Sequence, residues 1–188
     1  MRHDIVLHGY RFGIRPVTLG DAAFIVGLRT DPELGRYINP TSPNVADQEA
    51  WIARYLERPH DYYFIVEDLR AGAPVGAVGV YDVNDGRAEW GRWLIARTSP
   101  AAVESALLTY RAGLDVLGLE QVYCRTIADN DKVVSFHDSS GADRGRSIPE
   151  YAELGGRTFD AVEHTVDRAR WASMRPRLEQ LARRVAGT

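Results

Sequence analysis

Three closely spaced strands are the feature that most constrains how this chain can fold. Residues 62–68 (YYFIVED), 74–84 (PVGAVGVYDVN) and 87–95 (RAEWGRWLI) are rich in the β-branched and aromatic residues that favour strands. The segments between them, LRAGA and DG, consist largely of turn-forming residues. The sequence therefore predicts three strands in an antiparallel meander.

A helix and a further strand follow this meander. Residues 100–118 predict a helix that ends at Gly118, and residues 121–128 (QVYCRTIA) predict a strand. If the strands on either side of this helix are parallel neighbours, the crossover between them is right-handed. This order of elements predicts an α/β or α+β sheet with helices on both faces.

The remaining segments add elements on both sides of this unit. Asp21 can cap a helix that stops at Asp31-Pro32, and residues 31–44 are rich in Pro, Asn and Ser, which predicts an ordered loop or short turns. The other expectations are strands at 9–16 and 157–168, helices at 47–59, 129–141 and 168–185, a polar loop between Gly141 and residue 157, and an interruption or kink at Pro176.

Composition and charge exclude several classes of protein. The chain has 188 residues, a net charge of −3 and a pI near 6.0, so it lacks the basic excess that indicates nucleic-acid binding. Its single cysteine, Cys124, excludes an internal disulfide framework and a cysteine-rich metal site, and its apolar surroundings predict a packing role. No apolar run approaches the ~18 residues that span a membrane, and no secretory h-region is present. We expect a soluble cytoplasmic protein.

Four stretches resemble the GNAT acetyltransferase superfamily, especially its branch that acts on ribosomal-protein N-termini and amino sugars. They are, in chain order, GYRFGIRPVTLGDA, AEWGRWLI, LDVLGLEQVYCRTIADN and NDKVVSFHDSSGA, and they extend over residues 9–145. The last has the spacing of the family's N-x-x-S-x-x-L-Y-E-K-x-G-F helix. The resemblance implies an α/β (α+β) fold with a mixed, splayed central sheet of six to seven strands and helices on both faces. It also implies one acyl-CoA N-acyltransferase-like domain over residues 1–188.

Other segments indicate a narrower relative. LRTDPELGRYINPTSP, together with AVESALL and KVVSFH, is similar to enzymes that acetylate the 4-amino group of nucleotide-linked deoxyamino sugars. The resemblance implies an N-acetyltransferase that moves an acetyl group from acetyl-CoA to such a sugar, in a polysaccharide or antibiotic pathway. Two alternatives stay open. The acceptor is a protein N-terminus or an aminoglycoside, or the chain is a non-catalytic acyl-CoA or protein-binding module with a degenerate phosphate loop.

The phosphate loop is where this chain departs from the family. Members of the superfamily hold the coenzyme A pyrophosphate with a Q/R-x-x-G-x-G/A loop, and the corresponding segment here, RTSPAA, has Pro100 in place of the central glycine. A helix N-terminus attracts anions through its unpaired N–H groups, and proline removes one of them. The resemblance implies a pyrophosphate site built from the side chain of Arg97 and the amides of Ala101, Ala102 and Val103. The alternative is a capped helix start that binds nothing.

The resemblance assigns the pantetheine arm to the backbone of Trp93, Leu94 and Ile95. In this superfamily the fourth and fifth strands splay apart at this point, and the freed amide groups bond the arm and the acyl carbonyl. Asn130 and Ser135 are expected to contact the coenzyme near its thiol end. The alternative role for Trp93 is packing against the sheet.

His137 and Glu89 are the candidates for proton transfer. Transfer of an acyl group from a thioester to an amine needs a base for the ammonium proton and an acid for the departing thiolate. The family's acid is a tyrosine seven residues after the asparagine, and His137 stands there in this chain, seven residues after Asn130. Glu89 matches the family's fourth-strand glutamate and would act as the base, directly or through water. The alternatives are a locally bonded histidine and a carboxylate paired with an arginine.

The acceptor is expected at the loop between the first two helices. Tyr37, Asn39 and Ser42 offer groups that suit a polyhydroxylated sugar, and Tyr81 or Tyr37 could stack on a sugar or a base. The alternative is a loop that serves only its own turns. The partners expected are acetyl-CoA as co-substrate and a small-molecule amine, with no metal, nucleic acid or membrane, while a homodimer stays open.

Overall fold

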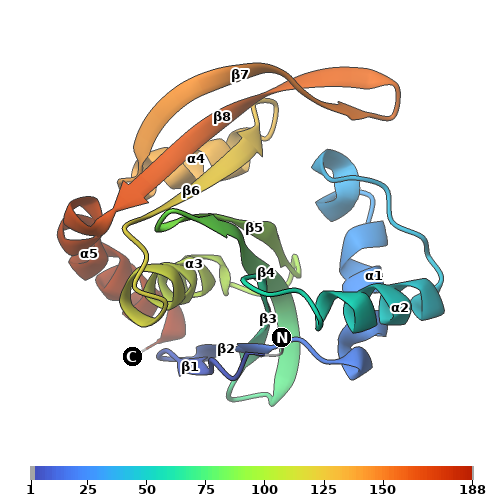
Figure 1. Ribbon diagram of the computed structural model, residues 1–188. Coiled ribbons are helices and arrows are strands. Elements are labelled where there is room, and N and C mark those ends of the chain that lie inside the picture. Colours follow the sequence, from blue (N-terminus) through green and yellow to red (C-terminus); the bar gives the residue numbers. More distant parts are fainter. Residues whose placement is uncertain (1–2, 188) are drawn as a thin grey trace.

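The computed structural model describes residues 3–187, which form one open sheet of eight strands with helices around it (Figure 1). The strands lie in the order β1-β2-β3-β4-β5-β6-β8-β7, and neighbours are antiparallel except for β5 and β6, which are parallel. Their bounds are β1 Leu7–His8, β2 Phe12–Pro16, β3 Tyr62–Asp68, β4 Ala73–Asn84, β5 Arg87–Ile95, β6 Gln121–Ile127, β7 Asp143–Leu154 and β8 Arg157–Asp167.

The helices cover both faces of this sheet. Figure 1 shows α1 and α2 on one side, and α3 and α5 on the other. The α-helices are α1 Ala22–Thr30, α2 Val45–Tyr55, α3 Ala102–Tyr110, α4 Asp131–Ser140 and α5 Arg168–Ala186. Shorter helical segments are η1 Leu19–Asp21 and η2 Leu34–Tyr37, and a π-helical segment, η3 Arg111–Val116, extends α3.

The alternation of side chains along β3 explains why both faces are covered. Phe64 and Val66 join the large buried cluster under α3 and α5, whereas Tyr63 and Ile65 join a second cluster under α1 and α2. Successive side chains of a strand point to opposite faces, so a strand that is apolar at every position must be buried on both sides. The expected fold class, a mixed sheet with helices on both faces, is confirmed.

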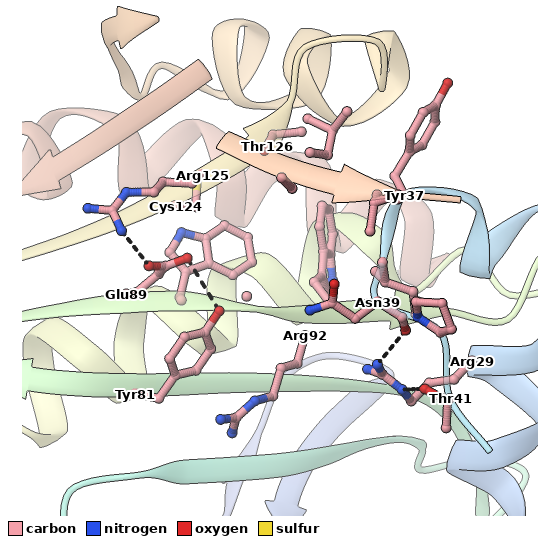
Figure 2. Close-up of a pocket in the computed structure, with 18 of the residues that line it drawn as sticks. Arg29, Tyr37, Asn39, Thr41, Tyr81, Glu89, Arg92, Cys124, Arg125 and Thr126 are labelled. Atoms are coloured by element: carbon pink, nitrogen blue, oxygen red, sulfur yellow. Dashed lines mark hydrogen bonds and ion pairs between the residues drawn. The ribbon is translucent and has the colours of Figure 1, made fainter. Parts of the chain in front are cut away.

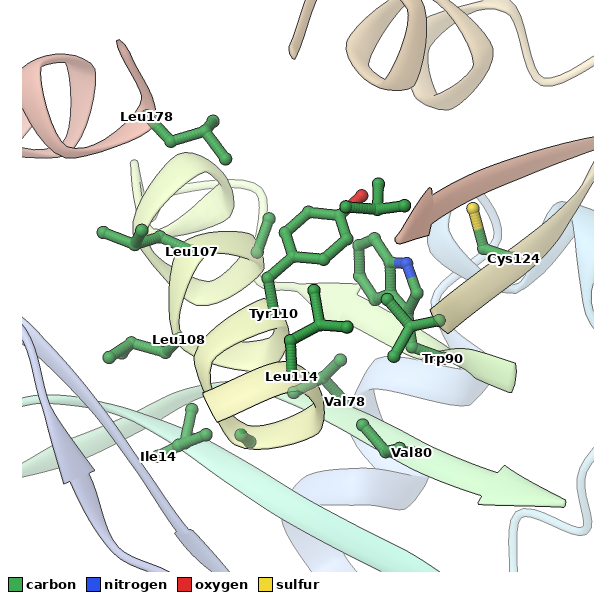
Figure 3. Packing of buried hydrophobic residues seen from close by; sticks show 14 of the residues in the cluster. Ile14, Val78, Val80, Trp90, Leu107, Leu108, Tyr110, Leu114, Cys124 and Leu178 are labelled. Atoms are coloured by element: carbon green, nitrogen blue, oxygen red, sulfur yellow. The ribbon is translucent and has the colours of Figure 1, made fainter. Parts of the chain in front are cut away.

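Aromatic packing fixes α3 against β5. Trp90 on β5 and Tyr110 on α3 lie edge to face with ring centroids 5.3 Å apart, and both are almost completely buried (Figure 3). Trp171 on α5 lies 5.6 Å from Tyr110 on the far side and donates from Nε1 to Oδ1 of Asp115 at 2.9 Å. These contacts hold the C-terminal end of α3 against both β5 and α5.

The pairing between β5 and β6 is short, and this creates the opening in the sheet. Only Arg87 to Glu89 of β5 pair with β6, where Tyr123 is the last partner. Beyond Glu89, β5 stays paired with β4, but a bulge adds one residue, and Arg92 takes a positive φ of 52°. The two central strands therefore separate after Glu89, as the expected splayed sheet requires.

The sheet has eight strands, one more than the upper end of the expected range. The segment expected to be a polar loop after Gly141 is β7, an edge strand paired with β8. Most of its side chains are exposed, so it lacks the apolar alternation by which strands are identified. The opening segment also differs, because the expected strand at 9–16 begins only at Phe12 and the two-residue β1 precedes it.

Helix bounds differ from expectation in three further places, one of which is α2, expected at 47–59 and found at Val45–Tyr55. The helix expected at 100–118 is α3 followed by the π-helical η3, and α3 itself begins at Ala102. The last helix runs without interruption through Pro176, whose side chain is exposed. Proline lacks the N–H of one helical bond, and the apolar face of α5, including Trp171, Met174 and Leu178, holds the helix together across it.

Two glycine-to-alanine variants test the packing of this frame. A Cβ at Gly113 in η3 would lie 2.8 Å from Cγ1 of Val122 on β6, whereas a Cβ at Gly27 in α1 would meet no atom within 4 Å. Gly113→Ala should lower the free energy of unfolding by about 1–3 kcal/mol through overpacking. Gly27→Ala should raise it by about 0.5–1 kcal/mol through helix propensity. Urea unfolding measures both, and equal changes in the two variants would contradict the packing described.

Candidate active site

A pocket of about 620 Å³ lies where β5 and β6 separate. Its walls come from the end of α1, from α2 and α4, from strands β3 to β6, from the end of β7, and from η2 and the loop after it. It brings together residues from most of the chain, including eight of those expected from the sequence: Tyr37, Asn39, Ser42, Tyr81, Glu89, Trp93, Asn130 and His137. The expected catalytic and acceptor residues therefore share one pocket.

Glu89 is the buried carboxylate of this pocket. Its side chain is on the last paired residue of β5, and only 7% of the residue is exposed. Oε2 accepts from Nη1 of Arg125 at 3.2 Å, and Oε1 accepts from the hydroxyl of Tyr81 at 3.4 Å (Figure 2). Burial raises the pKa of Glu89 above its ordinary value, although the positive charge of Arg125 opposes the shift. Such a carboxylate is a better base than an exposed one.

A glycine and a strained arginine put the hydroxyl of Tyr81 next to Glu89. A Cβ at Gly91 would lie 2.4 Å from the oxygen of Tyr81, so this approach requires glycine. Arg92 lies over the ring of Tyr81 at 4.2 Å and forms two hydrogen bonds with Asp61, at 2.6 and 3.0 Å. One face of the Tyr81 ring is thus covered by a guanidinium, and its hydroxyl is directed at a carboxylate.

His137 lies in the wall of the same pocket, on α4. It is 1% exposed, and its Nε2 is 3.4 Å from Sγ of Cys124. Nδ1 is buried and has no hydrogen-bond partner among residues 3–187. Burial, together with the neighbouring His164, lowers the pKa of His137 to about 3. His137 is therefore a neutral imidazole at physiological pH, which can donate a hydrogen bond but carries no charge.

Cys124 packs as its apolar surroundings predict. It belongs to the large core cluster and is 5% exposed, with Sγ reaching the pocket wall. Burial raises the pKa of the Cys124 thiol, and the nearby carboxylate of Glu89 raises it further. The thiol consequently stays protonated, and the reactive thiolate form is disfavoured.

The loop after η2 supplies one side of the pocket and reaches across to the other. The hydroxyl of Tyr37 donates to the backbone carbonyl of Asp129 at 3.0 Å, and its ring lies edge to face with Phe159 at 6.2 Å. The carbonyl of Asn39 accepts from Arg29 at 3.2 Å, and Ser42 donates to Asp47. The loop is held in place by these contacts, and its polar side chains still line the pocket.

The residues expected to bind coenzyme A divide into two groups. Trp93 and Asn130 line the pocket, and Leu94 and Ile95 pair with β4 while their other edge lies beyond the last pairing with β6. That edge is where freed backbone groups are expected. Ser135, by contrast, is exposed and lies outside the pocket lining.

In the expected phosphate loop, too, some residues are engaged with other parts of the protein and others are not. Arg97 is 55% exposed and pairs with Glu33 at 2.7 Å and with Asp31 at 3.8 Å. The amide of Ala101 donates to the hydroxyl of Ser99 at 3.3 Å, which leaves Ala102 and Val103 in the first helical turn. Amides of a first turn have no acceptor within their own helix. The first turn of α3 therefore offers the amides of Ala102 and Val103, which are fewer donors than a glycine-rich loop has.

Several pocket residues have no individual signal in the sequence. Arg29, Arg54, Arg92 and Arg125 all line the pocket, but arginines are too frequent in this chain to mark any one of them. Gly91 could have been noticed, since glycine inside a strand indicates a bulge or the close approach of another group.

No group of three or more His, Cys, Asp or Glu side chains in residues 3–187 is arranged to hold a metal ion. Among the described helices, none combines the length and the apolar character needed to cross a membrane.

Comparison with known proteins identifies the family. Residues 11–143 match the family model described as acetyltransferase (GNAT) domain, which is more than half of the chain. The protein therefore belongs to the GNAT acetyltransferases, and acetyl-CoA-dependent N-acetyl transfer is its expected activity. GNAT acetyltransferases act on small-molecule or protein amines. No curated protein sequence matches the chain.

Solved structures share the fold along nearly the whole chain. Apo FdhC, a nucleotide-linked sugar GNAT, is 29% identical with a TM-score of 0.79, covering 93% of this chain and 97% of its own. A GCN5-related N-acetyltransferase from Brucella melitensis is 18% identical with a TM-score of 0.83, covering 96% and 86%. A variant of the spermidine N-acetyltransferase SpeG from Vibrio cholerae is 19% identical with a TM-score of 0.76, covering 86% and 96%. The last two likenesses concern the fold alone.

Gly91→Ala tests the link between Tyr81 and Glu89. The new methyl group should displace the Tyr81 hydroxyl and lower kcat by about five- to tenfold, which corresponds to the net free energy of one hydrogen bond. Tyr81→Phe should lower kcat by a similar factor. The kcat of the double variant should be no lower than that of Tyr81→Phe, because the clash disappears with the hydroxyl. The measurement is thiol release from acetyl-CoA with an accepted amine. Losses that multiply in the double variant would contradict this geometry.

Proposed function

We propose that this protein transfers the acetyl group of acetyl-CoA to the primary amine of an amino sugar, in its nucleotide-linked form. The observation that carries the proposal is the buried carboxylate of Glu89, which has a raised pKa and faces a pocket with polar, uncharged side chains from the loop after η2. The likeness to FdhC, a nucleotide-linked sugar GNAT, along 93% of the chain supports the acceptor class.

The residues present fit coenzyme A in its main features. The edge of β5 at Trp93 to Ile95, left without β6, suits the amides of a pantetheine arm. The first turn of α3, at Ala102 and Val103, suits a pyrophosphate, with Arg97 near enough in sequence to add a charge if it leaves Glu33. Acetyl-CoA supplies an acyl group activated as a thioester.

Glu89 acts as the base in this proposal. An amine must lose its ammonium proton before it attacks, and a carboxylate with a raised pKa accepts that proton more readily than an exposed one. The hydroxyl of Tyr81 and the guanidinium of Arg125 hold the two oxygens of Glu89 in place. Tyr81 is thus a positioning residue for Glu89.

His137 donates a hydrogen bond to the departing thiolate in this proposal. Because its pKa is lowered to about 3, the imidazole is neutral and acts as an N–H donor to the sulfur. The proposal assigns this donation to Nδ1, which is buried and has no partner among the described residues. Its aromatic neighbours, Trp90 and Trp93 at 5.2 and 6.1 Å between ring centroids, exclude water around it.

The charge of the pocket favours some of the candidate acceptors over others. Four arginines line it, and two of them, Arg29 and Arg54, have no carboxylate partner among the described residues. A polyamine or an aminoglycoside carries several positive charges and would meet repulsion there. An amino sugar presents a single amine together with hydroxyls, which suit Asn39 and Ser42. A protein N-terminus remains the second candidate, tested by offering short peptides in the same assay.

Glu89→Gln tests the proposal. The amide keeps the shape of the side chain but cannot accept a proton, so kcat with a nucleotide-linked amino sugar should fall about 10²- to 10⁴-fold. Affinity for acetyl-CoA, measured by titration calorimetry, should not change. Glu49→Gln, on the exposed side of α2, is the matched control and should behave as the wild type. A Glu89→Gln enzyme with undiminished kcat, or a wild type that acetylates peptides and no amino sugar, would overturn the proposal.

A further inference from the structure

One arginine of the pocket has a charge that no carboxylate neutralises. Arg29, in the last turn of α1, lines the pocket and is partly buried. Its Nε donates to the hydroxyl of Thr41, and its Nη2 donates to the carbonyl of Asn39 at 3.2 Å. Neither acceptor is charged, and Nη1 forms no hydrogen bond within residues 3–187. The guanidinium therefore keeps its full charge and part of its donor set.

Two other arginines of the same pocket are different. Arg92 is paired with Asp61 by two hydrogen bonds, and Arg125 is paired with Glu89 and Glu163, each at 3.2 Å. A guanidinium withdrawn from water is normally accompanied by an anion, because the cost of desolvation is otherwise not compensated. Arg29 lacks such a partner in the described part of the chain, and the nearby Arg92 adds to the positive potential around it.

A second arginine of the same pocket also lacks a carboxylate partner. Arg54, on α2, lines the pocket and forms no ion pair with any described carboxylate. Trp51, one turn earlier on α2, adds an aromatic side chain to the lining. Asp47 lines the pocket as well, but it accepts from Ser42 and not from an arginine. A pocket with two arginines without carboxylate partners and an indole is suited to an oxyanion on an aromatic or sugar group.

This end of the pocket lies away from the proposed base. In Figure 2, Glu89 and Arg29 lie at opposite sides of the view, with Arg92 and Asn39 between them. An acceptor whose amine is at Glu89 can thus extend past Asn39 and place a second group at Arg29.

From this geometry we infer that the pocket holds an acceptor bearing an oxyanion, a phosphate or a carboxylate, which binds the guanidinium of Arg29 with Arg54 at the pocket mouth. The inference rests on the proposed function only in that the acceptor occupies this pocket. An acceptor without an oxyanion would leave the cation at Arg29 without a partner. A nucleotide-linked sugar meets the requirement through its diphosphate, and an aminated uronic acid would meet it through its carboxylate.

The test uses enzyme saturated with coenzyme A, so that the pyrophosphate site is already filled. Thymidine diphosphate, inorganic pyrophosphate and glucuronate are titrated into the wild type, Arg29→Gln, Arg29→Lys and Arg184→Gln. Arg184 lies exposed on α5 and serves as the matched control. Loss of one charge-assisted pair should weaken binding to Arg29→Gln by about ten- to a hundredfold. Arg29→Lys should lose less, because it keeps the charge, and Arg184→Gln should bind as the wild type does.

Each outcome is decisive. Binding of the diphosphate or of pyrophosphate identifies phosphate as the source of the oxyanion, and binding of glucuronate alone identifies carboxylate. If no probe binds the wild type below about 10 mM, or if Arg29→Gln binds as tightly as the wild type, the inference is overturned. Melting temperature and coenzyme A affinity show whether Arg29→Gln is folded, and Arg29→Lys repeats the comparison if it is not.

A parallel assay separates this inference from the proposed function. Acetylation of a free amino sugar that is insensitive to Arg29→Gln would leave the proposed transfer intact and refute the oxyanion subsite. Loss of diphosphate binding in Arg29→Gln, with no sugar acetylated by any form of the enzyme, would support the subsite and refute the sugar acceptor.

Discussion

The whole site depends on the point at which β5 and β6 stop pairing. Up to Glu89 the two strands are hydrogen-bonded neighbours, and beyond it β5 keeps only β4. A polar backbone edge needs a partner, which water or a bound molecule with its own donors and acceptors can supply. The same geometry buries the carboxylate of Glu89 at the start of the opening. Two local features of β5 lie at this point, the bulge at Arg92 and the glycine at position 91.

Burial gives the two candidate catalytic groups opposite properties. It raises the pKa of Glu89, which makes the carboxylate a better proton acceptor, and it lowers the pKa of His137 to about 3, which leaves the imidazole neutral. A tyrosine in the family and a neutral histidine here are both uncharged donors, so the replacement preserves the hydrogen-bonding role although the residue changes. The difference in protonation assigns the titrating role to Glu89.

The sequence predicted those parts of the structure that depend on local patterns. Strands β3 and β5 were predicted to the residue because turn chemistry bounds them, and Glu89, His137 and Tyr37 line one pocket as the resemblance implied. Strand β7 was missed because an exposed edge strand has no apolar alternation. The neutral state of His137 and the unpaired charge of Arg29 were inaccessible, since both follow from neighbours distant in sequence. The roles of Arg97 and Ser135 stay predictions without structural support.

The central claim is that Glu89, and not His137, is the group whose ionisation limits catalysis. Its most direct test is the dependence of kcat on pH, with both substrates saturating, in the wild type, Glu89→Gln and His137→Gln. A base with a raised pKa must be ionised to act, so wild-type kcat should fall as the pH drops through a value above the ordinary glutamate pKa. His137, with a pKa of about 3, should contribute no such fall between about pH 5 and 9. We predict that this acidic limb disappears in Glu89→Gln and persists in His137→Gln, and the reverse pattern would contradict the account.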